Sequence, residues 1–189
     1  MKISDADRDP SSIKKDNIDT IKIVDNFFEK ELFSKIQNHI STKIYYTPAY
    51  FTGTTEKTKE NYYGDRWLFV NDKKFLKLFV DQVAKKFKIK PKTICFTSAI
   101  DLRNLDHFKP HTDSGVAKIN ILIMLKGPSA VTNGTVFYTD KELDIHVGFK
   151  ENRAVLFPSA RFHSQHASKI PNLKRYTATI FIQDYEEEC

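Results

Sequence analysis

Two helical patterns come first along the chain. Apolar residues recur at helical spacing over residues 29–40 and again over residues 72–87, which predicts two amphipathic helices. Asn71 or Asp72 can cap the second helix, and Pro91 closes it. The two apolar stripes are Leu32, Phe33, Ile36 and Ile40 in the first helix, and Phe75, Leu76, Phe79, Val80, Val83 and Phe87 in the second.

After the second helix the period shortens to that of β-strands, and turn residues separate the segments. Helices followed by a run of short strands favour an α+β, mainly β fold, with helices packed on an antiparallel sandwich or barrel. The predicted strands are 94–103, 117–126, 135–139, 143–149, 153–157 and 174–183, with one more at 20–24 before the first helix.

The length and apolar content suit one domain. A chain of 189 residues with 40% hydrophobic residues can bury one substantial core. Residues 1–19 are polar and predict a flexible N-terminal lead, so the single domain spans 20–189. The aromatic-rich stretch 41–65 shows no clean period and is interpreted as a mobile covering loop.

Charge and cysteine content narrow the partners and the compartment. The 30 basic and 24 acidic side chains give a net charge of +6, but the lysines are scattered, so nucleic-acid binding is not expected. Cys95 and Cys189 cannot build a disulfide scaffold, which favours a reducing compartment. Without a signal-like or membrane-length apolar stretch, we expect a cytoplasmic protein, either a monomer or a homodimer, that does not bind membranes.

The candidate chemistry starts at His111-Thr-Asp113. In an extended segment, residues two apart project from one face, so this imidazole and this carboxylate can converge on one ion. A second histidine from a distant strand would complete a set that occupies one face of an octahedral iron and leaves positions open. Taken alone, the pair is equally typical of a surface turn after Pro110.

Two later segments strengthen this interpretation. A buried strand ends at Pro158, after which His163 is presented. Further on, strand alternation places Arg175 and Thr177 on one face, which would otherwise be interior. A buried guanidinium is costly unless an anion binds there, and a guanidinium next to a hydroxyl matches a carboxylate.

Together these residues resemble the iron(II)- and 2-oxoglutarate-dependent dioxygenases, in particular their prolyl-hydroxylase-like branch. The resemblance covers residues 24–182 and implies a double-stranded β-helix (jelly-roll) core from about residue 94, with two or more N-terminal supporting helices. Its segments are Val24-Asp-Asn-Phe-Phe28, His111-x-Asp113, Asn133-Gly-Thr-Val-Phe-Tyr138, Asn152-Arg-Ala-Val-Leu-Phe-Pro-Ser159, His163 and Arg175-x-Thr177.

The resemblance also implies the reaction. His111, Asp113 and a distal histidine would hold Fe(II), while Arg175 and Thr177 would hold the far carboxylate of 2-oxoglutarate. With O2, such an enzyme hydroxylates a C–H bond and releases succinate and CO2. The substrate it implies is a prolyl or other residue of a peptide, or a small amino-acid-like molecule.

The distal ligand has two candidates. His163 and His166 both precede Arg175 at offsets that occur in the family. An offset of three puts them on opposite faces of a strand, so only one can face inward. The spacing from Pro158 and the aromatic Phe162 favour His163, with His166 as the alternative.

Five more residues are candidates for the site. Asn120 interrupts an apolar strand and Tyr138 lies in a resembling segment, so we expect both near the co-substrate. A satisfied buried amide and a core aromatic are the alternatives. Candidates for substrate contact are Arg103, Arg66 and Trp67. The alternative role for Arg103 is a surface ion pair, and the alternative for Trp67 is simple packing.

Two other functions fit part of the pattern. A zinc hydrolase could use the same three ligands, but it would not need Arg175 on the same face. A non-enzymatic jelly-roll binding module would not need the complete ligand set. Nucleic-acid demethylases of the family carry a second arginine soon after the co-substrate arginine, and residues 176–182 contain none.

Overall fold

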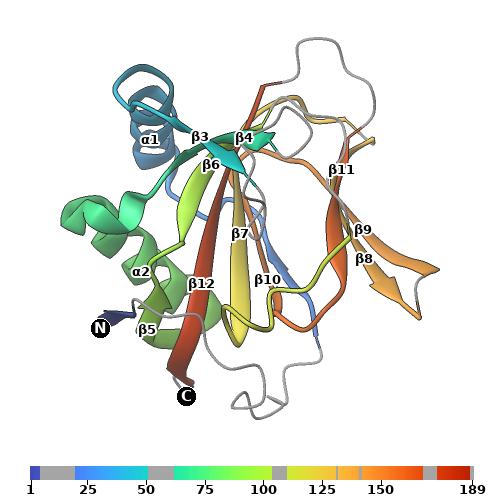
Figure 1. Cartoon of the computed structure of the whole chain (residues 1–189). Coiled ribbons are helices and arrows are strands. Elements are labelled where there is room, and N and C mark those ends of the chain that lie inside the picture. The colour runs from blue at the N-terminus through green and yellow to red at the C-terminus, as the bar shows by residue number, and fades with distance from the viewer. Residues whose placement is uncertain are drawn as a thin grey trace.

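The computed structural model describes residues 1–4, 20–50, 62–103, 110–130, 132–140, 142–167 and 174–187. They form two sheets with two helices on the outer face of the larger one (Figure 1). The helices are α1 (Lys30–Thr42) and α2 (Lys73–Phe87), with a 3-10 turn (Phe69–Asn71) before α2. The strands are β1 (Lys2–Ser4), β2 (Lys22–Val24), β3 (Thr47–Tyr50), β4 (Tyr62–Trp67), β5 (Ile89–Cys95), β6 (Ala99–Arg103), β7 (Ile119–Lys126), β8 (Asn133–Thr139), β9 (Glu142–Gly148), β10 (Arg153–Pro158), β11 (His163–Ala167) and β12 (Arg175–Glu187).

The larger sheet has nine strands, and the smaller has three. In the larger sheet the main path runs β2-β10-β7-β12-β6-β4-β3, with β5 joined to β12 and β1 joined to β5. The smaller sheet has the order β11-β8-β9. All neighbours pair antiparallel except β1 and β5. Two facing antiparallel sheets supported by helices are the predicted jelly-roll architecture.

Strand β7 shows how the layers are held together. Ile119, Ile121 and Ile123 belong to the core under the helices, whereas Leu122 and Met124 pack toward the smaller sheet. Because alternate side chains of a strand point to opposite faces, a central strand covered on both sides is apolar throughout. We call the side of the larger sheet that faces the smaller one its inner face. Asn120 lies on this inner face.

The helices form where the apolar stripes predicted them. Asp72 caps α2, because its carboxylate accepts hydrogen bonds from the backbone N–H groups of Lys74 and Phe75 at 3.0 Å. The helix ends at Phe87 as predicted, but Pro91 does not end it: Lys88, the next residue, adopts a left-handed conformation (φ 58°), and Pro91 is a buried residue of β5. Within the described chain, neither helix is long and apolar enough to cross a membrane.

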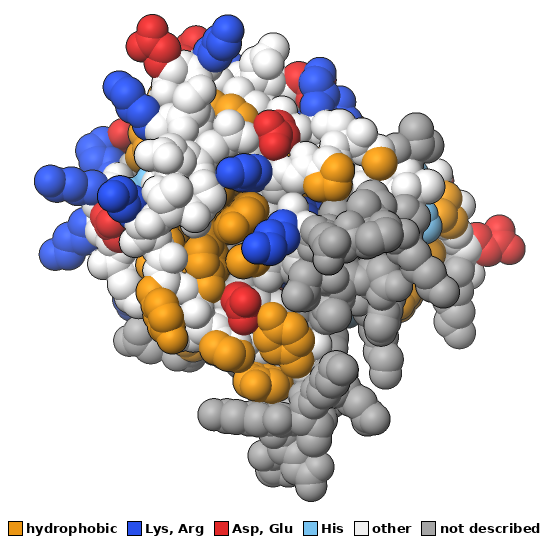
Figure 2. All heavy atoms as spheres, turned by 90° about the horizontal axis from the view of Figure 1, so that it is seen from above, with side chains coloured by type: hydrophobic (Ala, Val, Ile, Leu, Met, Phe, Trp, Pro, Cys, Tyr) orange, Lys and Arg blue, Asp and Glu red, His pale blue; other side chains and the backbone are white. Residues whose placement is uncertain are grey.

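Basic side chains follow the helical layer. Figure 2 shows that on this face most lysine and arginine side chains project on the side of α1 and α2, with acidic side chains between them. On α2, Lys73, Lys74, Lys77 and Lys85 are exposed, and Lys77 pairs with Asp81. These lysines lie on the side of α2 opposite to its apolar stripe.

Several strands differ from the predicted ones. The segment 94–103 is two strands, β5 and β6, separated by a turn at 96–98 in which Ser98 N bonds to Cys95 O. Part of the expected covering loop forms the hairpin partners β3 and β4, while residues 51–61 lie outside the described part. These strands have little period of their own and are defined by their pairing partners.

Two short strands, β1 and β11, were not predicted. Lys2–Ser4, expected within a flexible lead, pairs with β5, whereas residues 5–19 lie outside the described part. His163–Ala167, for which we predicted no strand, is β11 and pairs with β8. β1 has only three residues and β11 (HSQHA) is almost wholly polar, so neither shows a hydrophobic alternation in the sequence.

The link from β2 to α1 is anchored to the turn before β10. The side chain of Asn152 accepts from Phe28 N and donates to Phe28 O, both at 2.8 Å. Next to it, Asp25 binds Arg153 (Nε to Oδ1, 2.7 Å) and Lys150 (Nζ to Oδ2, 2.8 Å). These bonds join segments that are far apart in the sequence.

Asp25 gives the fold a measurable acid sensitivity. The hydrogen bond from Arg153 lowers the pKa of the Asp25 carboxyl from 3.8 to about 2. Because the folded pKa is the lower one, the stability it contributes is present above pH 3.8 and is lost as pH falls toward 2. After allowance for solvent screening this is about 1 kcal/mol. We therefore expect Asp25→Asn to lose about 1 kcal/mol of unfolding free energy at pH 7 and much less at pH 2 in urea titrations; an equal loss at both would contradict this.

Candidate metal centre

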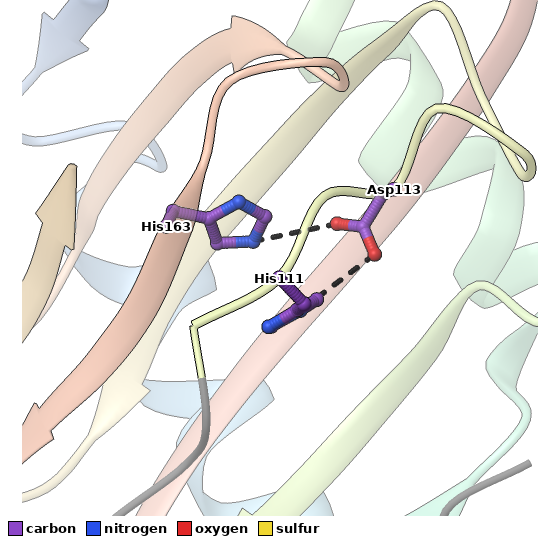
Figure 3. A group of neighbouring side chains, drawn as sticks. All are labelled: His111, Asp113 and His163. Carbon is purple, nitrogen blue, oxygen red and sulfur yellow. Dashed lines mark ion pairs between the residues drawn. The ribbon is translucent and has the colours of Figure 1, made fainter. Parts of the chain in front are cut away.

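Three potential metal ligands meet at the inner face. One ligand atom each from His111, Asp113 and His163 lies within 4.8 Å of the others. His111 Nε2 is 3.7 Å from Asp113 Oδ1, and His163 Nε2 is 3.4 Å from Asp113 Oδ2 (Figure 3). His111 and Asp113 come from the segment before β7, whereas His163 begins β11. The distal histidine of the cluster is therefore the one that the spacing favoured.

Backbone hydrogen bonds bring these segments together. His111 and His163 form an isolated bridge, in which each backbone N–H donates to the other residue's carbonyl at 2.9 Å. Two residues on, Asp113 N donates to Ser159 O at 2.8 Å. Because the first segment is extended at this point, both of its candidate ligands project toward β11.

The protonation states suit a metal. His163 Nδ1 lies 2.8 Å from the carbonyl oxygen of Arg161, which can only accept, so in the neutral imidazole this nitrogen carries the proton and Nε2 keeps its lone pair. Burial acts to raise the pKa of the Asp113 carboxyl, but when the two imidazoles are protonated, the hydrogen bond from His163 and the two positive charges outweigh burial and lower the pKa. A bound metal would displace the Nε2 protons and supply positive charge in their place. Asp113 is therefore ionised. Two imidazoles and one carboxylate form a donor set for a divalent transition metal.

Asn120 contacts this cluster from β7. Its Nδ2 donates to Asp113 Oδ2 at 2.6 Å, and its side chain is fully buried. The prediction placed Asn120 near a co-substrate, and the structure places it directly on a candidate metal ligand.

Arg175 is a buried cation on the same inner face. It is 2% exposed, and one terminal nitrogen donates to Asn133 Oδ1 and to Gly134 O, both at 2.9 Å. Its guanidinium lies 5.3 Å from the centre of the Phe149 ring, and its Nε has no hydrogen-bond partner among the described residues. Burial, with the nearby Arg103 charge, lowers the pKa of the Arg175 guanidinium to about 9, although Asp101 opposes this.

This arrangement favours an anion. Both acceptors that hold Arg175 are neutral, and no carboxylate of the described chain lies within ion-pair distance of it. A buried charge of this kind is costly without a counter-ion. Thr177, two residues on, is 2% exposed, and strand alternation puts it on the same face.

Two buried polar residues of β8, the strand that holds Arg175, were not among the predicted site residues. Asn133 fixes the guanidinium, and Thr135 is 3% exposed with its Oγ1 unpartnered within the described part. Both lie in the segment 133–138, which carried the resemblance. Alternation along this segment could have identified them, because it puts residues 133, 135 and 137 on one face.

Arg66 and Arg103 share one buried carboxylate. Asp101, 1% exposed, accepts from Arg66 Nε at 2.7 Å and from Arg103 at 3.1 Å. Burial acts to raise the pKa of the Asp101 carboxyl, but the charges of the two arginines lower it. In the β6–β12 register Asp101 lies opposite Thr177, and Arg103 opposite Arg175. Both arginines therefore lie on the Arg175 side of the inner face.

The structure does not bring Trp67 and Tyr138 to the cluster. Trp67 packs against Phe75 of α2, with ring centres 5.1 Å apart, and belongs to the core under the helices. The Tyr138 hydroxyl lies 2.9 Å from Ser164 Oγ, on the face of the smaller sheet opposite to His163. Strand alternation explains both positions, because each residue neighbours an inward-facing one.

His166 is also turned away. It is exposed, and its ring packs edge-on against that of His146 with centres 5.3 Å apart. The offset of three from His163 reverses the side of β11 on which it lies.

The comparisons with known proteins concern the fold. No protein-family model matches this sequence. No curated protein matches it either. Among solved structures, a prolyl hydroxylase from Trichoplax adhaerens, in complex with a hypoxia inducible factor oxygen degradation domain peptide fragment, is similar over 89% of this chain and 85% of its own. The TM-score is 0.66 at 12% identity.

Three further structures, of two proteins, agree. A Pseudomonas putida prolyl-4-hydroxylase matches 89% of this chain and 94% of its own, with a TM-score of 0.57 at 12% identity. The non-heme alpha ketoglutarate dependent epimerase SnoN from nogalamycin biosynthesis matches 90% of this chain and 81% of its own, with a TM-score of 0.61 at 9% identity. SnoN has also been solved with Fe3+, alpha ketoglutarate and nogalamycin RO, and that structure matches with a TM-score of 0.56. At these identities the likeness shows a shared fold, which confirms the predicted jelly-roll class.

Proposed function

We propose that this chain is an iron(II)- and 2-oxoglutarate-dependent oxygenase of the prolyl-hydroxylase-like branch. The observation that carries the proposal is the combination of a His111, Asp113 and His163 cluster with a buried Arg175 on the same inner face. Neither feature alone would indicate this chemistry. The shared fold with two prolyl hydroxylases and with an epimerase that depends on alpha ketoglutarate supports it.

The residues present fit both groups. Two imidazoles and an ionised carboxylate match the ligand set of non-heme iron(II) oxygenases, which leaves positions open on the metal. Arg175 offers a guanidinium inside the protein whose Nε has no partner among the residues that the structure describes, which suits the distal carboxylate of 2-oxoglutarate. When bound, iron(II) with 2-oxoglutarate and O2 supplies the oxidation of a C–H bond, with release of succinate and CO2.

The chain's own residues hold and orient these groups. The Arg161 carbonyl fixes the tautomer of His163, so that Nε2 faces the metal position. Asn133 and Gly134 hold the Arg175 guanidinium in place, so that it need not reorganise when an anion binds. The Phe157 ring packs edge-on against His163 at 4.8 Å, which excludes water from that side.

For the substrate we propose an amino-acid residue of a peptide, or a small amino-acid-like molecule. The support is the peptide bound by the Trichoplax adhaerens relative and the small molecule bound by SnoN. Arg66 and Arg103 are the proposed substrate contacts, because they lie on the inner face beside Arg175. We further propose that the protein is cytoplasmic, acts as a monomer or homodimer, and does not use nucleic acid.

The alternatives account for fewer observations. A zinc hydrolase would leave the buried Arg175 without a role. A non-enzymatic binding module would leave the complete ligand cluster without one.

The proposal predicts a spectroscopic signature. Anaerobic addition of iron(II) and 2-oxoglutarate should give a weak visible charge-transfer band in the wild-type protein, and His111→Ala should lack it. In air, the wild type should form succinate, and mass spectrometry across a panel of peptides and amino acids should show a product with one added oxygen. If wild type and His111→Ala are spectroscopically alike, the binding-module alternative holds.

A further inference from the structure

Asn120 is a polar residue at an apolar position. It lies in β7 within a run of buried aliphatic residues, and it is fully buried. Its neighbours in register are Phe157 on β10 and Phe181 on β12. An amide at such a position costs stability unless its hydrogen bonds are made, and a leucine of similar shape would avoid that cost.

The amide makes one strong bond and leaves one atom unpaired. Its Nδ2 donates to Asp113 Oδ2 at 2.6 Å, and its Oδ1 is buried without a partner among the described residues. The orientation of the amide follows from its partner, because an ionised carboxylate can only accept. The Asn120 side chain therefore keeps its bond to Asp113 although its Oδ1 has no partner among the described residues. We take this as a sign that the residue serves the bond to Asp113 and not the packing of the core.

The two oxygens of Asp113 are thereby made unequal. Each oxygen lies near one imidazole, Oδ1 at 3.7 Å from His111 Nε2 and Oδ2 at 3.4 Å from His163 Nε2, but Oδ2 also receives the amide of Asn120. A carboxylate that binds a metal through both oxygens takes two positions, whereas one that binds through a single oxygen takes one. An octahedral iron needs the second arrangement if two histidines, a chelating co-substrate and O2 are all to find a place.

We propose that Asn120 is a positioning residue that keeps Asp113 a one-oxygen ligand and so preserves the coordination position that 2-oxoglutarate needs. This inference rests on the proposed function. It predicts that loss of the amide donor weakens co-substrate binding without weakening metal binding. A merely structural amide would affect neither, and a general disturbance of the cluster would affect both.

The test uses Asn120→Leu in the full chain. We expect Mn(II) affinity, measured by electron paramagnetic resonance without co-substrate, to be unchanged or tighter. In the anaerobic iron(II) titration, the half-saturating 2-oxoglutarate concentration for the charge-transfer band should rise about 10- to 100-fold, as for other partners of metal ligands. Ile121→Val is the matched control, because Ile121 is the next residue of β7 but packs under the helices. It should leave both titrations as in the wild type.

Each outcome has one meaning. An unchanged 2-oxoglutarate titration in Asn120→Leu overturns the inference, and so does a loss of Mn(II) binding that accompanies weaker co-substrate binding. If wild type and Ile121→Val give no band at all with iron(II) and 2-oxoglutarate, the proposed function fails. Should Asn120→Leu be poorly folded by circular dichroism, Asn120→Ala serves the same two titrations with the same expected result.

Discussion

Replacement of His163 with alanine is expected to abolish metal binding, whereas replacement of His166 with alanine leaves it intact. His163 Nε2 is 3.4 Å from Asp113 and is held by the Arg161 carbonyl, so the substitution removes a ligand whose tautomer and direction are already set. The loss should exceed the ~10- to 100-fold effect typical of outer partners of metal ligands. Succinate formation should fall to background. Isothermal titration with Mn(II), together with a succinate assay, measures both effects.

His166→Ala is the matched control for this experiment. It makes the same chemical change three residues away on the same strand, but on the exposed side next to His146. If His166→Ala lost metal binding while His163→Ala kept it, the cluster would be assigned to the wrong face of β11.

Replacement of Arg175 with methionine is expected to remove most of the affinity for 2-oxoglutarate. The guanidinium is 2% exposed, and loss of one partner of a buried, hydrogen-bonded charge pair costs about 2–5 kcal/mol. By the relation between affinity and free energy, this corresponds to a roughly 30- to 4,000-fold weaker Kd. Mn(II) binding should be unaffected, because Arg175 is not part of the ligand cluster. The anaerobic charge-transfer titration measures the change.

The same variant makes a second, independent prediction. In the ligand-free protein the described residues that hold the buried Arg175 cation are neutral acceptors, so methionine should leave the unfolding free energy unchanged or raised. Arg153→Met serves as the control: it removes an arginine that pairs with Asp25, so it should lower stability and leave co-substrate affinity alone. Unchanged 2-oxoglutarate affinity in Arg175→Met would refute the assigned role.

Local pattern was sufficient for the elements with a strong period. The helices α1 and α2 begin and end within two residues of the predicted ranges, because an apolar stripe of three turns or more is specific to a helix facing a core. Asp72 was one of the two residues predicted to cap α2, and it could be predicted because its hydrogen bonds are to residues two and three positions away. Such features depend on neighbours in the sequence.

Features that depend on a distant partner were missed or misplaced. The strand β1 has only three residues and β11 is almost wholly polar, so neither shows a hydrophobic alternation; both exist because β5 and β8 supply their hydrogen bonds. Trp67 and Tyr138 were assigned to the site by their place in the sequence, yet each lies on the face of its strand that points away from the cluster. A shift of one residue reverses that face, and the sequence does not show which face the partner strands cover.

By itself, the sequence determined the donor types and their spacing: the His111 and Asp113 pair, two histidines three residues apart, and an arginine with a hydroxyl two residues on. It also determined that only one of the two histidines could face inward, since side chains alternate along a strand. Tertiary structure alone decided which histidine meets Asp113, that Arg175 is enclosed with no carboxylate partner in the described part of the chain, and that Asn120 binds the aspartate. These results depend on how strands distant in the chain pair and on what then covers each face, and no local pattern encodes either.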